Sequence, residues 1–205
     1  MRRPVFIARQ SSHPRGLLGR VLARIMERET AVENAWTRGL LALEPSDSVL
    51  ELGFGHGSNL MELARAVPHG HVAGVDHSQD MRRLAARRCA KLLQSGRVAL
   101  DCADTRALPY PDGRFDKAIS VHTLYFWEDP LDDLKEIRRV LRPGGTLVLG
   151  FRPKDDRASS DFPETVYRFY ARREVEDLLE RSGFATVRIH STAPAFMAAR
   201  ADRTI

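Results

Sequence analysis

The chain has 205 residues, of which 43% are hydrophobic and 29% are charged. This length and composition are typical of one globular domain with a substantial core, and they leave little room for a second domain. The net charge of +5 and the pI near 9.6 permit an anionic partner such as nucleic acid, but the arginines are scattered among acids, so we interpret them as a solvated surface.

Cys89 and Cys102 are too few and too far apart for a disulfide framework or a C-x-x-C metal site. Both lie in apolar patterns, which predicts core thiols in a reducing compartment and no metal site. The apolar stretch after Arg2 and Arg3 is shorter than a signal-peptide core, and no run reaches the length of a membrane span. We therefore expect a cytoplasmic protein without integral membrane association.

Residues 1–13 show no periodicity and are expected to form an arm. Apolar residues then recur at helical spacing from Pro14 to Ile25, and again from Val32 to Leu41 after a polar stretch at 27–30. This pattern predicts two helices ahead of the first strand. We assign residues 1–44 to the same domain as a core that covers residues 45–205.

In the middle of the chain, continuous apolar runs that predict strands alternate with apolar residues at helical spacing that predict helices. Strands are expected at 49–52, 71–76, 98–102, 115–121 and 146–151, with helices at 60–67, 78–95 and 131–141. Such alternation predicts a doubly wound α/β fold with a mostly parallel sheet. The last third departs from it, with a polar loop at 152–161, a helix ended by Gly183, and two strands at 185–190 and 195–201 that form a final hairpin.

The most informative stretch is Glu51-Leu52-Gly53-Phe54-Gly55-His56-Gly57, which reads as strand, tight loop and helix start. Glycines at such a crossing allow positive φ and let a ligand approach the main chain. The spacing is G-x-G-x-G, whereas a dinucleotide fingerprint is G-x-G-x-x-G and a P-loop requires a lysine. Because Glu51 also lies at the strand end, the loop suits a ligand that carries positive charge.

The motif E-x-G-x-G-x-G resembles the first motif of class I S-adenosylmethionine-dependent methyltransferases. Further motifs agree in order, namely G-V-D ending at Asp76, Asp104 after the third strand, Phe115-Asp116, and the run 141–145. The resemblance covers about residues 40 to 201. It implies a Rossmann-like sheet with an antiparallel last strand, and N-terminal helices that cover the cofactor site.

The resemblance implies S-adenosylmethionine as cofactor and S-adenosylhomocysteine as product. Asp76 would accept both ribose hydroxyls, because ligands lie outside the carboxyl ends of the strands in such sheets. Asp104 would accept the adenine amine. The expected cofactor-binding residues are Glu51, Gly53, Phe54, Gly55, Gly57, Asp76, His77, Met81, Ala103, Asp104, Thr105, Val121 and His122.

His122 ends the fourth expected strand, and as a general base it would have a suitable ordinary pKa. A loop-shaping or cofactor-contacting role is the alternative. The aromatic run 125–127 follows, and one or two of its rings are expected to wall the acceptor pocket while the others join the core. Arg9 and His13 in the arm are expected to close over that pocket.

Methyl transfer from a sulfonium mainly requires that acceptor and methyl be held in line and kept dry, so a base is optional. We expect a small-molecule acceptor of the lipid, quinone or secondary-metabolite type, and no nucleic acid. An NAD(P)-dependent oxidoreductase, a nucleic-acid methyltransferase and a non-catalytic binding protein stay open as alternatives. Against an oxidoreductase, the chain lacks the third glycine of the dinucleotide fingerprint and a Tyr-x-x-x-Lys pair. Against a nucleic-acid methyltransferase, it lacks an N-P-P-Y type motif. The oligomeric state does not follow from the sequence.

Overall fold

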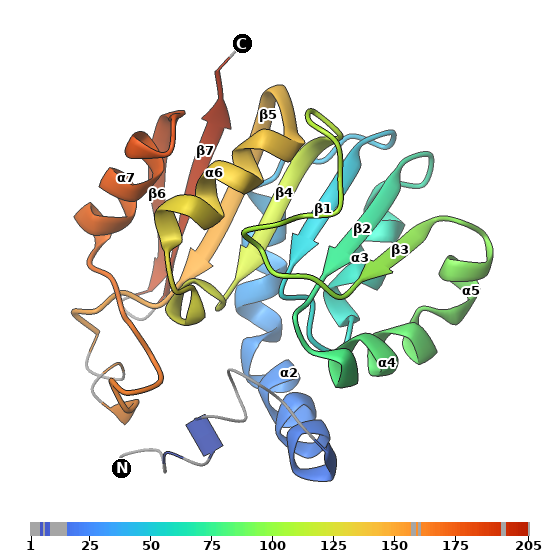
Figure 1. The fold of residues 1–205 in the computed structure, drawn as a ribbon, viewed down its shortest axis with the longest axis horizontal. Coiled ribbons are helices and arrows are strands. Elements are labelled where there is room, and N and C mark those ends of the chain that lie inside the picture. The colour runs from blue at the N-terminus through green and yellow to red at the C-terminus, as the bar shows by residue number, and fades with distance from the viewer. Residues whose placement is uncertain are drawn as a thin grey trace.

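The computed structural model describes residues 5, 7, 8, 16–156, 159, 161–193 and 196–204. The sheet has seven strands in the order β3-β2-β1-β4-β5-β7-β6 (Figure 1). All pairings from β3 to β5 are parallel, and β7 pairs antiparallel with both β5 and β6. The strands are β1 Ser48–Leu52, β2 His71–Val75, β3 Val98–Asp101, β4 Phe115–Val121, β5 Leu141–Phe151, β6 Phe184–Ala193 and β7 Phe196–Arg203. The predicted fold class is confirmed.

Helices cover both faces of the sheet, as the doubly wound topology requires. In Figure 1, α6 (Pro130–Val140) and α7 (Arg172–Arg181) lie in front of the sheet, and α3 (Ser58–Ala66) lies behind it. Alternate strand residues face opposite sides because the side-chain period of a strand is two. Leu50 therefore packs in the cluster that contains Leu134 and Leu179, whereas Val49 joins the cluster with Leu60 on the other face.

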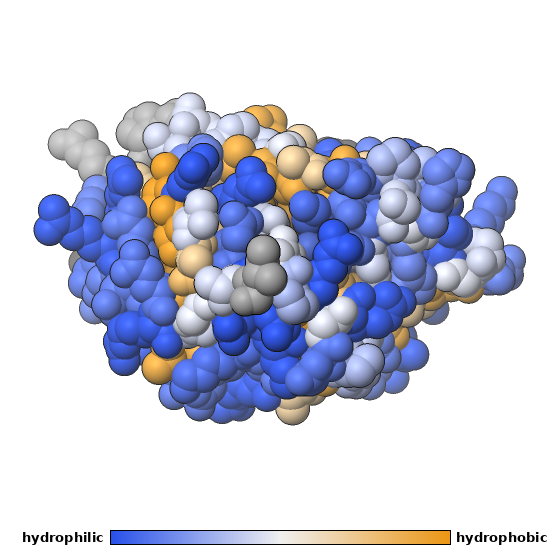
Figure 2. Space-filling view, turned by 90° about the horizontal axis from the view of Figure 1, so that it is seen from above, coloured by the Kyte–Doolittle hydropathy of each residue, from blue (hydrophilic) through white to orange (hydrophobic). Residues whose placement is uncertain are grey.

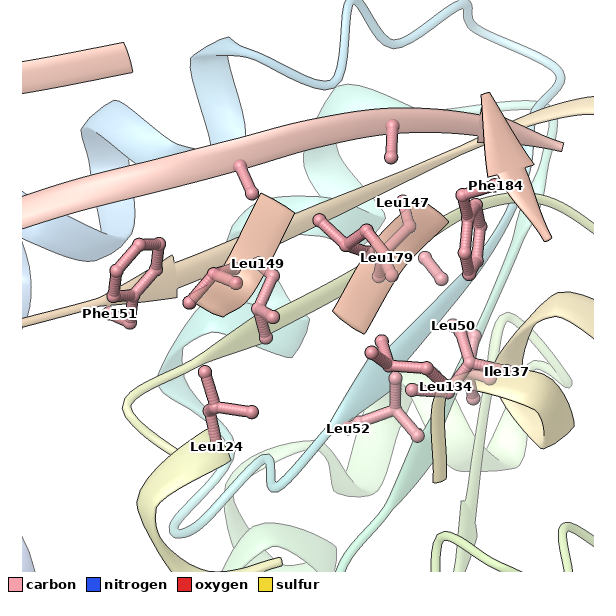
Figure 3. Packing of buried hydrophobic residues seen from close by; sticks show 14 of the residues in the cluster. Leu50, Leu52, Leu124, Leu134, Ile137, Leu147, Leu149, Phe151, Leu179 and Phe184 are labelled. Atoms are coloured by element: carbon pink, nitrogen blue, oxygen red, sulfur yellow. The ribbon is translucent and has the colours of Figure 1, made fainter. Parts of the chain in front are cut away.

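The front cluster is the larger of the two hydrophobic cores. Figure 3 shows leucines of β1 and β5 meeting side chains of α6 and of the α7–β6 segment, with Phe151 and Phe184 at its two ends. This core contains Leu52 of β1 and Ala118 of β4. The opposite end of the sheet, seen from above in Figure 2, is covered mostly by hydrophilic residues.

The N-terminal region differs from the prediction of two helices. Where two helices are expected, residues 16–39 form the single helix α2, Gly16–Gly39. The polar stretch 27–30 contains no glycine or proline, so it continues the helix, and Glu29 is exposed. Within the expected arm, Val5, Ile7 and Ala8 are helical, and Ala8 is buried in the front cluster. The arm residues Arg9 and His13 lie outside the described residues.

The helix α2 approaches the sheet closely at β5. A Cβ atom at Gly150 would lie 2.8 Å from the Phe196 ring and 3.0 Å from Thr37 Oγ1, so only glycine fits there. The ring of Trp36 packs edge-on against Phe196, with centroids 5.8 Å apart. This contact sets where the rest of α2 passes over the end of β4.

Three smaller expectations are corrected. The helix expected at 78–95 is divided into α4 (Gln79–Arg88) and α5 (Ala90–Gln94), because Cys89 leaves helical geometry with φ −93° and ψ 14°. Strand β5 begins at Leu141, ahead of the expected 146, because Leu141 already pairs with Phe115. Cys89 is buried as predicted, but Cys102 is half-exposed and is no core thiol.

Candidate active site

The glycine loop between β1 and α3 is a tight turn stabilised by backbone hydrogen bonds, one to β2 and one within the loop. The N–H of Gly53 donates to the Val75 carbonyl at 2.7 Å, and the N–H of Gly57 donates to the Phe54 carbonyl at 2.9 Å. Gly53, Gly55 and Gly57 have φ angles of 71°, 54° and 83°, in the left-handed region that favours glycine. The loop therefore has the strand, turn and helix order that the sequence predicts.

The three glycines have different surroundings. A Cβ atom at Gly53 would collide with the Thr123 methyl group, and one at Gly57 would lie 2.8 Å from Ala85 Cβ. A Cβ atom at Gly55 would meet nothing within 4 Å. Gly53 and Gly57 thus permit close packing of the protein on itself, and Gly55 leaves open space over the loop where a ligand fits.

Glu51 lies beneath this loop as a buried carboxyl group. Its Oε1 accepts a hydrogen bond from Asn59 Nδ2 at 3.1 Å, and Asn59 Oδ1 in turn accepts one from Arg38 Nη1 at 2.5 Å. Its Oε2 is buried and has no hydrogen-bond partner within the described part of the chain. Burial raises the pKa of Glu51 to about 8. Such an orphaned oxygen fits a ligand that brings an ammonium or sulfonium group.

Asp76 is also buried, at the carboxyl end of β2. Its Oδ2 accepts the N–H of Gly55 at 2.9 Å, and its Oδ1 accepts the N–H of Ser78 at 2.8 Å. Burial raises the pKa of Asp76 from its ordinary value. The carboxylate therefore shapes the glycine loop directly, and sequence reasoning, which assigned it to a ribose alone, missed this contact.

Asp104 lies in the turn after β3, and it is exposed. Arg106 donates to both of its carboxylate oxygens, from Nε to Oδ1 at 3.1 Å and from Nη2 to Oδ2 at 2.9 Å. These hydrogen bonds lower the pKa of Asp104. Arg106 Nη1 also lies 3.0 Å from Glu128 Oε2, so it joins the turns after β3 and β4.

The other predicted cofactor residues surround the same edge of the sheet. Phe54 is buried, and its ring lies against Gly74, where a Cβ atom would be only 2.7 Å away. Met81 is buried behind the Ser78 cap of α4. The remaining members, each with at least part of its surface exposed, are His77, Ala103, Thr105 and Val121.

His122 directly follows β4 and has a φ angle of 60°, which is uncommon for a residue other than glycine. Its N–H donates to the Gly150 carbonyl at 2.9 Å, which holds the backbone in place. The imidazole has partners at both nitrogens, because Nε2 lies 2.5 Å from Glu33 Oε2 and Nδ1 lies 3.1 Å from the Tyr125 hydroxyl. Strained residues of this kind cluster at functional sites.

A cavity of about 80 Å³ lies beside this histidine, and since one water needs about 10–15 Å³ it holds a group of several heavy atoms. Its lining combines aromatic rings with a few charged groups. The lining residues are Glu29, Thr30, Glu33, His122, Tyr125, Phe126, Arg152, Phe162, Tyr167 and Phe169. Trp127 instead packs against the front core.

Sequence reasoning did not find Glu33, Arg152, Phe162 and Phe169. Glu33 lies inside an expected helix, and Arg152 begins a stretch that was interpreted only as a polar loop. Their nearness to His122 carries no local signal, since Glu33 and His122 are 89 residues apart. Across the described ranges, no group of three or more His, Cys, Asp or Glu residues is placed to hold a metal ion. Nor is any helix there long and apolar enough to cross a membrane.

Comparison with known proteins agrees with this geometry. A family described as "Methyltransferase domain" matches residues 50–149. The chain is 33% identical over 165 residues to the uncharacterized methyltransferase YdaC of Bacillus subtilis, which covers 80% of this chain and 86% of that protein. The chain therefore belongs to the class I S-adenosylmethionine-dependent methyltransferases, and S-adenosylmethionine is its cofactor.

Two further similarities extend this result. The chain is 42% identical over 145 residues to an uncharacterized protein of transposon TN4556 from Streptomyces fradiae, covering 70% of this chain but only 41% of that protein. A solved S-adenosylmethionine-dependent methyltransferase from Aquifex aeolicus superposes with a TM-score of 0.76 at 24% identity, over 88% of this chain and 96% of that one. The latter similarity shows the fold alone.

Proposed function

We propose that this chain transfers a methyl group from S-adenosylmethionine to a flat, largely apolar small molecule of the lipid, quinone or secondary-metabolite type. The observation that carries this proposal is the aromatic cavity beside His122. It adjoins the glycine loop, because Thr123, the residue after His122, packs against Gly53. An acceptor in the cavity would thus lie next to a cofactor held on the loop.

The cofactor would be held mainly by the backbone and two buried carboxyl groups. Gly55 leaves space over the loop, and α3 begins without a side-chain cap, so its first N–H groups are open to a ligand. Glu51 would offer its unpartnered oxygen toward the cationic end, and Asp76 would use its remaining lone pairs for the ribose hydroxyls. Asp104 would accept the adenine amine once Arg106 yields one of its two hydrogen bonds.

The bound cofactor supplies an activated methyl group on a sulfonium. The chain's own contribution is then to hold the acceptor in line and to keep water out. The rings of Phe126, Tyr167 and Phe169 serve the second purpose, since they pack on one another with centroids 4.9 to 5.7 Å apart. The two free cysteines suit a reducing compartment, and we propose that the chain acts in the cytoplasm on a small molecule, without a nucleic-acid partner.

Titration calorimetry and thermal unfolding with S-adenosylhomocysteine and with NADH test the proposal. S-adenosylhomocysteine should bind and raise the Tm, because a ligand at 100 times its Kd stabilises the folded state by about 2.7 kcal/mol. NADH should leave the Tm unchanged. Stabilisation by NADH with no response to S-adenosylhomocysteine would contradict the proposed function and favour an oxidoreductase.

A further inference from the structure

A line of hydrogen bonds runs along one wall of the cavity from Arg152 to Glu33. The backbone N–H of Arg152 donates to the Tyr125 hydroxyl oxygen. The hydroxyl lies 3.1 Å from His122 Nδ1. Since that oxygen already accepts the Arg152 N–H, its own proton is directed to Nδ1. Tyr125 is buried, and burial raises the pKa of its hydroxyl, so it stays protonated and remains a donor.

This arrangement determines which nitrogen of neutral His122 carries the proton. With Nδ1 accepting from Tyr125, the proton must be on Nε2, which then donates to Glu33 Oε2 at 2.5 Å. Both imidazole nitrogens are thereby occupied. His122 is left without a lone pair that an acceptor molecule can use, which argues against its direct role as general base.

Glu33 is better placed than His122 to act as a general base. Its Oε2 accepts from His122, whereas its Oε1 lies 3.7 Å from Arg152 Nη2, beyond hydrogen-bond distance but within ion-pair range. The Glu33 side chain is 19% exposed, and it lines the cavity. The titratable and charged groups around it are His122 from the end of β4, Arg152 from the end of β5 and Glu29 one turn earlier on α2. Asp156 lies 3.8 Å from the far side of Arg152.

We propose that Glu33 receives the proton of an aromatic or enolic hydroxyl on the acceptor, while His122 and Tyr125 act as positioning residues that orient its carboxylate. The inference rests on the proposed function and narrows it to methyl transfer onto oxygen. The acceptor O–H bond breaks and its proton passes to Glu33. The oxygen forms a bond to the methyl carbon, and the sulfur of the sulfonium donor keeps the electron pair of the broken S–C bond.

The cavity selects such a hydroxyl by charge and shape. Phe162, Tyr167 and Phe169 present rings for a flat molecule, and the Arg152 guanidinium lies 5.8 Å from the Phe162 ring centroid. A carboxylate accepts a hydrogen bond from a neutral O–H and repels an oxyanion. A protonated amine has no lone pair with which to take a methyl group, whereas a hydroxyl keeps its lone pairs while its proton is hydrogen-bonded to Glu33.

A first experiment measures which ionisation state of a phenol the protein binds, without any methyl transfer. Para-nitrophenol is titrated with protein saturated in S-adenosylhomocysteine, at the pH where half of the free probe is ionised. The phenolate has its own visible absorption. The wild-type protein should lower that absorption, because it binds the neutral phenol. The Glu33→Gln variant should bind phenolate, relative to neutral phenol, about tenfold better than wild type does. Equal behaviour of the two proteins would overturn the proposal.

Glu62→Gln is the matched control, because it removes a carboxylate that pairs with Arg65 on the exposed surface of α3. It should behave as wild type. Nitrogen-15 NMR of His122 shows which ring nitrogen carries the proton, and we expect Nε2 in the wild-type protein. A proton on Nδ1 alone would contradict the inferred orientation. Calorimetry with S-adenosylhomocysteine must give wild-type affinity for Glu33→Gln, which shows that the variant is folded.

A second experiment measures methyl transfer to two phenols of similar size. Para-cresol is neutral at about pH 8.5, since its hydroxyl resembles that of tyrosine with a pKa near 10, whereas para-nitrophenol is already ionised there. Glu33→Gln should lower kcat for para-cresol by about 10²–10⁴-fold and change kcat for para-nitrophenol by less than about tenfold. Equal losses, or no transfer to either phenol by a wild type that binds S-adenosylhomocysteine, would overturn the role of Glu33. Failure of wild type to bind S-adenosylhomocysteine would instead overturn the proposed function.

Discussion

The cofactor loop and the aromatic cavity are neighbouring parts of one site, but they are built differently. The loop uses seven consecutive positions, 51–57, and its contacts are largely between backbone atoms. The cavity takes side chains from α2, the end of β4, the end of β5 and the segment 162–169. The first is a local motif, whereas the second exists only where distant segments meet.

This difference explains why the sequence identifies the family but does not identify the acceptor molecule. A backbone loop with three positive φ angles needs glycine at each of them, so the loop can be recognised from its residue types. A wall of aromatic rings accepts many substitutions, because ring area and not a particular contact excludes water. Changes in the loop should therefore affect cofactor binding alone, and changes in the cavity should affect the acceptor alone.

The largest expected effect is that of Asp76→Ala on cofactor affinity. The variant loses the proposed ribose contacts and also releases the Gly55 N–H, so S-adenosylhomocysteine should bind about 2–4 kcal/mol more weakly, roughly thirty-fold to several hundred-fold. Asp76→Asn keeps one acceptor and should fall between alanine and wild type in calorimetry. Affinity of Asp76→Ala within a factor of two of wild type would show that Asp76 only shapes the turn.

Glu51→Gln should give a smaller effect, on stability and its dependence on pH. Because burial raises the folded-state pKa of Glu51 to about 8 from 4.5, the unfolded chain holds fewer protons between these values, and wild-type stability falls as pH rises through this window. Glutamine removes that dependence. The variant should match wild type near pH 5 and exceed it by about 2 kcal/mol near pH 6.5 in urea unfolding. A stability difference independent of pH would contradict the buried, protonated state of Glu51.

The smallest effect is expected for Phe162→Ala in the cavity. The ring packs against Tyr167 and Phe169, with centroids 4.8 and 5.5 Å away, and its loss should weaken binding of para-cresol by about 1 kcal/mol, or roughly fivefold. Affinity for S-adenosylhomocysteine should remain within a factor of two. NMR titration and calorimetry provide these two values, and a parallel loss of both would remove the distinction between loop and cavity.

The elements of the fold could be predicted because their signals are local. Apolar runs such as 115–121 and the turn at Gly183 determine a strand and a helix end with little help from the rest of the chain. The two-helix prediction for the N-terminus was wrong, because polar residues at 27–30 were taken for a break although none of them interrupts helical hydrogen bonding. Polar side chains on a helix can simply face solvent, so polarity by itself does not mark a helix end.

By itself the sequence determined the order of strands and helices, the glycine loop and the family, since hydrophobic period and turn residues act within a few positions. Only the tertiary structure decided that Glu33 meets His122, and that Tyr125 directs the His122 proton toward that carboxylate. That meeting depends on how closely α2 packs on β5 over Gly150. Packing distances between elements arise from the whole folded chain, and so the acceptor site, unlike the cofactor loop, has no signature in any one stretch of residues.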